Sequence, residues 1–299
     1  MHTLTVKSLS KFTFGDMIAE YQIVAESKRV GLRLYPKSKA KAVVKQRADI
    51  HHTPEIQSII RSGFLSLIPA NVPESVVQIA CAGDAHQAET LRGADSTTGL
   101  KFTSQAVEKK GGTTTVKTFL EHDNGLSAIH HLIHEKGSLS LRSFTTVTNG
   151  AREVKRLELL SSFSLTGLSP FAKDDSPGRL NLHRLRCSWS AEGRHLNQPL
   201  EEINLEPSWL NFFHRVERFG QVGSRALEAW FPFVAVEDKK ENVFWGAQIV
   251  WSASWQIDVA RKDDALNVMG GLADRDFGHW FKDLRPKESF TSPEAVLTV

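Results

Sequence analysis

The stretch AQIVWSASWQIDV, residues 247–259, has an apolar residue at every odd-numbered position. The positions between them are mostly polar, and a period of two residues is typical of a β-strand that buries one face. We therefore predict one long strand over this stretch. The charged run RKDD at residues 261–264 predicts a turn, and residues 265–269, ALNVM, would return as the partner strand.

Similar alternation marks much of the remaining chain. It recurs at residues 30–34, 76–79, 100–102, 116–119, 139–148 and 157–165. The dipeptide Asn149-Gly150 follows one of these segments and is a strong signal for a tight hairpin turn. Helical signals are few. Thr53-Pro54 predicts the start of one short helix, and the apolar spacing between Ser208 and Val216 predicts a second.

Many strands and few helices predict an all-β fold. We expect a large antiparallel β-super-sandwich with few short helices, because alternating strand and helix segments of the βαβ type are absent. The segment at residues 171–178, FAKDDSPG, combines charged residues with Pro and Gly and predicts a long loop. Strands of similar character lie on both sides of that loop, so we predict a single domain spanning residues 1–299.

The composition is that of a soluble globular protein. Hydrophobic residues make up 40% and charged residues 24% of 299 residues, which supplies a sizeable core. No apolar run approaches the roughly 20 residues of a membrane helix, and the first residues carry no secretory signal, so we expect a cytoplasmic protein with no membrane partner. The net charge of +3 is small and mixed, so no nucleic-acid partner is expected. Cys81 and Cys187 lack paired spacing, which predicts two buried reduced thiols.

The residues show no recognisable catalytic set. In HHLIH, residues 130–134, His130 and His134 would share a face of a strand or a helix. However, the glutamate expected after the first histidine of a zinc peptidase is replaced by His131, and no third ligand is in view. Most carboxylate pairs lie in turn-like segments, and neither a nucleophile elbow nor a phosphate-binding loop is present. We therefore assign no catalytic residue, no metal ligand and no cofactor.

The tryptophans are unevenly distributed, since all 7 lie between Trp189 and Trp280. Trp251 and Trp255 fall on the apolar face of the predicted long strand, where core packing is expected. Trp189, Trp209 and Trp280 lie outside that strand. Because aromatic faces stack on the C–H surfaces of sugars, these three are candidate substrate-binding residues.

A series of ordered motifs runs through the second half of the chain. They are LHRLR at 182–186, WSAEG at 189–193, LEPSW at 205–209, RFGQVGS at 218–224, FPFVAVE at 231–237, WGAQ at 245–248, WSASWQ at 251–256 and ESFTSP at 288–293. In this order they resemble the N-terminal domain of glycoside hydrolase family 36, the bacterial α-galactosidases. Before residue 157 the likeness is looser and rests on residues 76–79 with Gly83-Asp84, and on residues 100–102.

The resemblance implies a galactose-mutarotase-like super-sandwich that is followed, in the intact enzyme, by a (β/α)₈ barrel. That barrel carries the catalytic carboxylates, one of them in a Lys-Trp-Asp motif that this sequence lacks, so no catalytic residue is carried over. We expect the N-terminal part of a longer enzyme that acts on galacto-oligosaccharides, with its own C-terminal catalytic barrel as a partner.

The resemblance also implies an oligomer. In oligomeric relatives the sandwich domain helps to assemble the tetramer and can lend a loop to a neighbour's sugar pocket. The Asp-Tyr-Arg motif of that loop is absent here, and Asp84 takes its place by order in the sequence alone, as a fourth candidate substrate-binding residue. The alternative is a free-standing carbohydrate-binding or protein-interaction module.

Overall fold

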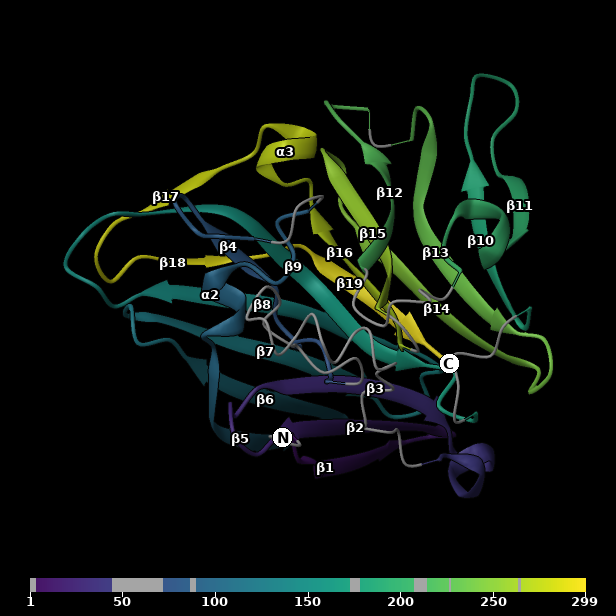
Figure 1. The fold of residues 1–299 in the computed structure, drawn as a ribbon, viewed down its shortest axis with the longest axis horizontal. Coiled ribbons are helices and arrows are strands. Elements are labelled where there is room, and N and C mark those ends of the chain that lie inside the picture. The colour runs from purple at the N-terminus through teal and green to yellow at the C-terminus, as the bar shows by residue number, and fades with distance from the viewer. Residues whose placement is uncertain are drawn as a thin grey trace, which may run out of the picture.

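The computed structural model describes residues 4–44, 72–86, 90–172, 178–206, 214–225, 227–262 and 265–299. Within these ranges the chain forms two almost entirely antiparallel sheets that share one large apolar core (Figure 1). The all-β antiparallel sandwich predicted from the sequence is therefore confirmed.

The first sheet is organised around its longest strand. Its described strands are β1 (Val6–Phe14), β2 (Met17–Val24), β3 (Val30–Pro36), β4 (Ile79–Cys81), β9 (Lys155–Leu168), β12 (His214–Gln221), β15 (Trp255–Lys262), β16 (Ala265–Leu272) and β17 (Lys282–Leu284). They run in the order β1-β2-β3-β9-β16-β15-β12, and β4 and β17 also pair with β9. Every residue of β9 from Leu157 onward is buried, as expected for a strand covered on both faces.

The second sheet contains ten strands within the described ranges. They are β5 (Lys101–Lys110), β6 (Thr113–Glu121), β7 (Leu126–Glu135), β8 (Leu141–Asn149), β10 (Leu180–Arg186), β11 (Arg194–Pro199), β13 (Trp230–Asp238), β14 (Val243–Val250), β18 (Ser289–Thr291) and β19 (Glu294–Thr298). The order is β11-β10-β13-β14-β19-β8-β7-β6-β5, and β18 pairs with β8. Strand β19 therefore lies between β14 and β8, in the middle of the sheet.

Helices are short in the described parts of the chain. They are α2 (Asp95–Thr98), α3 (Arg275–Gly278) and the 3₁₀ turns η1 (Lys37–Ala42) and η2 (Leu200–Ile203). None of them has the length and apolar character needed to cross a membrane. The helix predicted from Thr53 lies outside the described residues. The helix predicted up to Val216 is wrong at its end, because Val216 belongs to β12, where it pairs with Ala260 of β15.

Residues 247–259, which the alternation predicts to be one strand, belong to two strands. Residues up to Val250 form β14 of the second sheet, and residues from Trp255 form β15 of the first. Residues 251–254 cross between the sheets. Trp255 is fully buried, whereas Trp251 is 42% exposed, so the expected core position of Trp251 is wrong. The predicted return strand is confirmed as β16, with Lys262 opposite Ala265.

The Asn149-Gly150 turn also departs from the prediction, because it does not join a hairpin. Strand β8 belongs to the second sheet and β9 to the first, so the chain crosses the sandwich here. The Asn149 side chain directs the crossing by donating from Nδ2 to the carbonyls of Glu153 (2.8 Å) and Leu284 (2.9 Å). It also accepts from the backbone N–H of Ala151 at 3.0 Å. The Asn149 side chain therefore stabilises the crossing through its hydrogen bonds and does not form a hairpin turn.

Candidate functional site

Three of the four sequence-predicted site residues, Asp84, Trp189 and Trp280, lie in the described part of the chain, on separate segments. Trp189 lies in the loop between β10 and β11 and is 95% exposed. Trp280 is half-buried and packs against Phe290, with 5.8 Å between ring centroids. Trp209 lies outside the described residues. Within the described part of the chain, no hydrogen bond or ring contact joins Asp84, Trp189 and Trp280 to one another.

Asp84 has a local structural role. Its Oδ2 accepts the backbone N–H of Cys81 at 2.8 Å and that of Ser96 at 3.1 Å. These two bonds tie the loop after β4 to the start of α2. A carboxylate that satisfies two backbone donors keeps a loop in one conformation.

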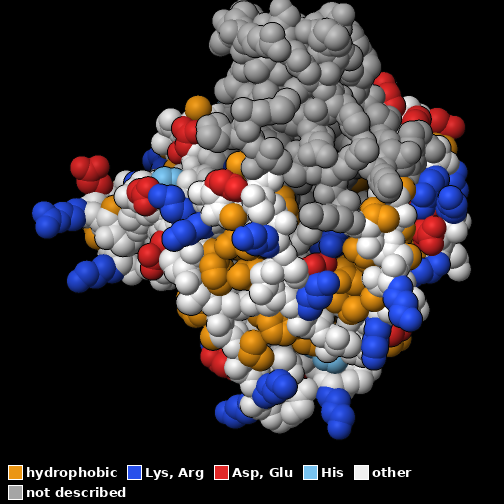
Figure 2. All heavy atoms as spheres, turned by 60° about the horizontal axis from the view of Figure 1, so that its bottom comes forward, with side chains coloured by type: hydrophobic (Ala, Val, Ile, Leu, Met, Phe, Trp, Pro, Cys, Tyr) orange, Lys and Arg blue, Asp and Glu red, His pale blue; other side chains and the backbone are white. Residues whose placement is uncertain are grey.

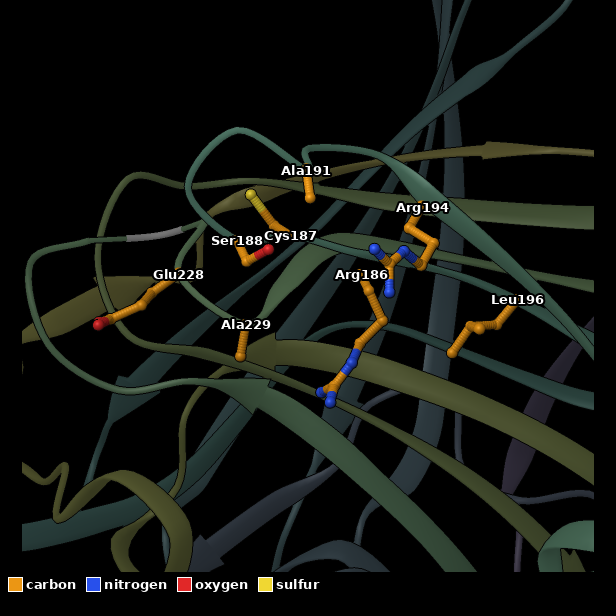
Figure 3. Close-up of a pocket in the computed structure, with 8 residues that line it drawn as sticks. All are labelled: Arg186, Cys187, Ser188, Ala191, Arg194, Leu196, Glu228 and Ala229. Atoms are coloured by element: carbon orange, nitrogen blue, oxygen red, sulfur yellow. The ribbon is translucent and has the colours of Figure 1, made fainter.

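A pocket of about 350 Å³ opens beside the Trp189 loop (Figure 3). It is lined by Arg186, Cys187, Ser188, Ala191, Arg194, Leu196, Glu228 and Ala229. The hairpin of β10 and β11 that forms one wall projects from the sandwich (Figure 1). Cys187 is half-buried here, whereas Cys81 is buried, and both are free thiols, so the prediction of two buried thiols is correct only for Cys81. The pocket volume lies at the lower end of the range for small-molecule sites, about 300–1,000 Å³.

Two arginines line this pocket, and one of them stacks on an indole outside the lining. Arg186 and Arg194 are direct cross-strand partners in the β10–β11 pairing. The guanidinium carbon of Arg186 lies 4.4 Å from the centroid of the Trp230 ring, and that of Arg184 lies 4.8 Å from the same ring. Stacking on an aromatic face holds a guanidinium in one orientation. Sequence reasoning missed these residues, because only the strand register shows that Arg186 and Arg194 are neighbours.

A second pocket, of about 750 Å³, lies between the edge strand β1 and the β5–β6 hairpin. Its lining combines the lysines Lys11, Lys109, Lys110 and Lys136 with Phe12, Phe14 and Val107. Figure 2 brings forward the end of the molecule that carries β1 and shows hydrophobic side chains exposed between lysines and arginines there. This pocket is wider than the first one, and its charges are flexible lysines rather than positioned arginines.

A hydrogen-bonded chain of three side chains crosses the outer face of the second sheet. His183 Nε2 lies 3.0 Å from Glu237 Oε2, and His183 Nδ1 lies 2.9 Å from His195 Nε2. The three residues come from the adjacent strands β13, β10 and β11. Their polar atoms form a line instead of converging on one point. No group of three or more possible metal ligands occurs in the described ranges.

The HHLIH segment belongs to strand β7, where His130 and His134 face the core. His130 lies 3.3 Å from the Tyr21 hydroxyl and 3.0 Å from Ser143 Oγ. Burial lowers the pKa of His130 to about 3, so the ring is neutral near pH 7. His131 points to the opposite face and stacks on Phe144. The three histidines are thus divided between two faces of the sheet, and each has a packing or hydrogen-bonding role.

Two buried carboxylates, Asp238 and Asp258, serve the fold. Burial raises the pKa of Asp238, but hydrogen bonds from Ser169, the backbone of Glu241 and Arg179 more than offset this and hold it below its ordinary value. Burial raises the pKa of Asp258, although Arg218 3.2 Å away opposes the shift. Both carboxylates are 0% exposed. A substrate in solution therefore cannot reach either of them for acid–base chemistry.

Comparison with known proteins gives a consistent result at the level of fold. The galactosidase domain of an α-galactosidase-sucrose kinase, AgaSK, superposes with a TM-score of 0.66 at 14% identity, over 96% of this chain and 40% of that one. The α-galactosidase of Lactobacillus brevis superposes with a TM-score of 0.63 at 13% identity, over 97% of this chain and 39% of that one. The chain has the fold of the N-terminal part of these α-galactosidases.

A third neighbour extends the comparison. A variant of the GH36 α-galactosidase AgaA from Geobacillus stearothermophilus, solved in complex with raffinose, gives a TM-score of 0.62 at 14% identity, over 97% of this chain and 40% of that chain. No protein-family model matches the sequence, and no curated protein is significantly similar to it. The chain thus spans about two fifths of the length of the solved enzymes whose fold it shares.

Proposed function

We propose that the chain is the non-catalytic N-terminal domain of an α-galactosidase-like retaining glycoside hydrolase. The observation that carries this proposal is the fold match over nearly the whole chain to about 40% of several α-galactosidases. Neighbours solved with raffinose and stachyose support terminal α-galactosides as the substrate class of the parent enzyme. The ordered sequence motifs between residues 182 and 293 point to the same family independently of the superposition.

Three acidic side chains in the described part of the chain are unsuited to glycosidase chemistry. A retaining glycosidase needs two accessible carboxyl groups about 5–5.5 Å apart, on either side of the scissile bond. In the described residues, Asp238 and Asp258 are fully buried, and Asp84 is committed to backbone donors. The nucleophile and the acid/base would come from the C-terminal barrel of the parent enzyme.

We further propose that this cytoplasmic domain, as a single unit, assembles the enzyme into a homo-oligomer and helps to shape the sugar pocket. Asp84, which two hydrogen bonds hold against Cys81 and Ser96, would place its described neighbours at residues 82–86 beside the pocket of a neighbouring part. Of the candidate substrate contacts, Trp189 has the greatest freedom to meet a ligand, since 95% of its surface is exposed.

Incubation of the 299-residue chain with an aryl α-galactoside tests the proposal. We expect no release of the aryl group above the buffer rate. Substantial hydrolysis that a single Asp or Glu substitution abolishes would contradict a non-catalytic role. A positive prediction accompanies it: the reading frame should continue past Val299 into a (β/α)₈ barrel with a Lys-Trp-Asp motif.

The second candidate is a free-standing carbohydrate-binding module, and the exposed indole of Trp189 beside a pocket is the observation that favours it. Titration of galactose and raffinose, followed through the indole N–H signals in NMR spectra, would distinguish the two. A shift of one indole signal that is lost in Trp189→Ala and kept in the control Trp251→Ala supports sugar binding. If no signal shifts at millimolar sugar, the assembly role stands.

A further inference from the structure

The two arginines of the β10–β11 hairpin form a like-charge pair. Arg186 and Arg194 lie directly opposite each other in the antiparallel register, and both are exposed. Like charges in directly opposed positions of a sheet destabilise it. Within the described ranges, no carboxylate forms an ion pair with either guanidinium.

A nearby arginine, Arg184, has partners for its charge within the protein. Arg184 is buried, pairs with Glu217 and donates to Gln198 at 2.7 Å. Its charge is therefore compensated inside the protein. Arg186 and Arg194 lack such compensation, although both line a pocket.

The geometry of the pocket leaves the donors of the two arginines available. Arg186 rests on the face of Trp230 at 4.4 Å, a contact that uses the face of the guanidinium plane and leaves the N–H groups at its edge. In Figure 3 the Glu228 carboxylate points away from both guanidinium groups, and the Ser188 side chain faces the same pocket. The site therefore presents two guanidinium groups and a hydroxyl, while the one carboxylate of its lining, that of Glu228, is directed away from them.

We propose that this pocket binds the phosphate group of a small molecule. Guanidinium groups bind tetrahedral oxyanions through paired, charge-assisted hydrogen bonds, and two of them in register can hold one phosphate from two sides. A volume of about 350 Å³ accommodates the phosphate together with a small organic part. Binding of a dianion also removes the repulsion between the arginines. The inference rests on these residues alone and is independent of the proposed role in a galactosidase.

Calorimetric titration tests this proposal, with inorganic phosphate and glucose 6-phosphate as probes at constant ionic strength. We expect saturable binding, about tenfold weaker in Arg186→Gln and in Arg194→Gln, which corresponds to about one charge-assisted hydrogen bond each. The matched control is Arg152→Gln, which removes the same charge from another exposed arginine. Tighter binding of the sugar phosphate would identify a phosphate ester as the ligand, and equal binding would identify free phosphate.

Thermal unfolding supplies a second, independent measurement. Without phosphate, Arg194→Gln should unfold at the same temperature as the wild type or at a higher one, because the repulsion is gone. Added phosphate should raise the unfolding temperature of the wild type more than that of Arg194→Gln, and the control Arg152→Gln should respond as the wild type does. The proposal is overturned if the wild type binds neither probe at tens of millimolar, or if Arg152→Gln weakens binding as much as the pocket variants do.

Discussion

Trp251 and Trp255 are four residues apart, and the structure predicts very different effects for their replacement by alanine. Trp255 is fully buried and meets Phe219 edge-on, with 6.1 Å between ring centroids, whereas Trp251 is 42% exposed. That exposed fraction of a side chain of about 150–250 Å² corresponds to about 60–100 Å² left in water. At about 25 cal/mol per Å², Trp255→Ala should cost about 2 kcal/mol more than Trp251→Ala. The total for Trp255→Ala should be about 3–5 kcal/mol.

Urea unfolding followed by far-UV circular dichroism measures this difference without depending on tryptophan fluorescence. If Trp255→Ala fails to fold, the milder pair Trp255→Phe and Trp251→Phe keeps the comparison, with the larger loss again at Trp255. A single continuous strand across residues 247–259 would place both indoles in the core. Equal losses of stability in the two variants would therefore refute the crossover at residues 251–254.

Three further predictions concern buried polar groups. Burial lowers the pKa of His130 from 6.5 to about 3, so the native state resists protonation and stability is lost as the pH falls from about 6.5 toward 3. In His130→Gln, the free energy of unfolding in urea should fall less steeply between pH 7 and pH 5, by at most about 1.4 kcal/mol per pH unit. An unchanged dependence of this free energy on pH would contradict a neutral buried ring. The pKa of Asp238 lies below its ordinary value of 3.8. The ionised carboxylate therefore stabilises the native state above about pH 3.8, and this stabilisation is lost as the pH falls through the lower native pKa. Asp238→Asn should cost about 3 kcal/mol at pH 7, because Arg179 loses its closer carboxylate and keeps only Glu241 at 3.6 Å. The difference in unfolding temperature from the wild type should narrow below about pH 3.8 rather than stay constant. Asn149→Ala leaves the Leu284 carbonyl without its side-chain donor and should cost about 2–3 kcal/mol in urea unfolding, whereas a loss below about 0.5 kcal/mol would argue against its role in the crossover.

Much of the fold could be predicted from the sequence, because alternation depends only on which face of a strand is buried. The return of β15 into β16 is an example, and the strand predicted at residues 116–119, which belongs to β6, is another. Alternation could not reveal that residues 247–259 belong to two sheets. Both sheets bury their inner face in the same core, so Ile249 in one sheet and Ile257 in the other point inward with the same parity. Because the apolar alternation continues unbroken through residues 251–254, it gives no sign that the chain passes from one sheet to the other there.

The candidate site was less predictable, since it depends on pairs that are distant in sequence. The residue type makes Trp189 a candidate, but its nearly complete exposure follows from its place in the loop of the β10–β11 hairpin. Arg186 and Arg194 become neighbours through strand register alone. Asp84 was selected by its order in the chain, and only the structure shows that its carboxylate is occupied by backbone donors.

The position of β19 has a consequence for synthesis on the ribosome. Residues 294–298 pair with β14 on one side and with β8 on the other. Until they leave the exit tunnel, β8 and β14 are two open edges with unpaired backbone groups, and such edges readily pair with other chains. The second sheet therefore closes only after residue 298 has been translated, and its open edges are prone to aggregation until then. Ribosome profiling of chaperone-bound ribosomes should show a chaperone bound to the nascent chain until residue 298 has been translated and has left the exit tunnel.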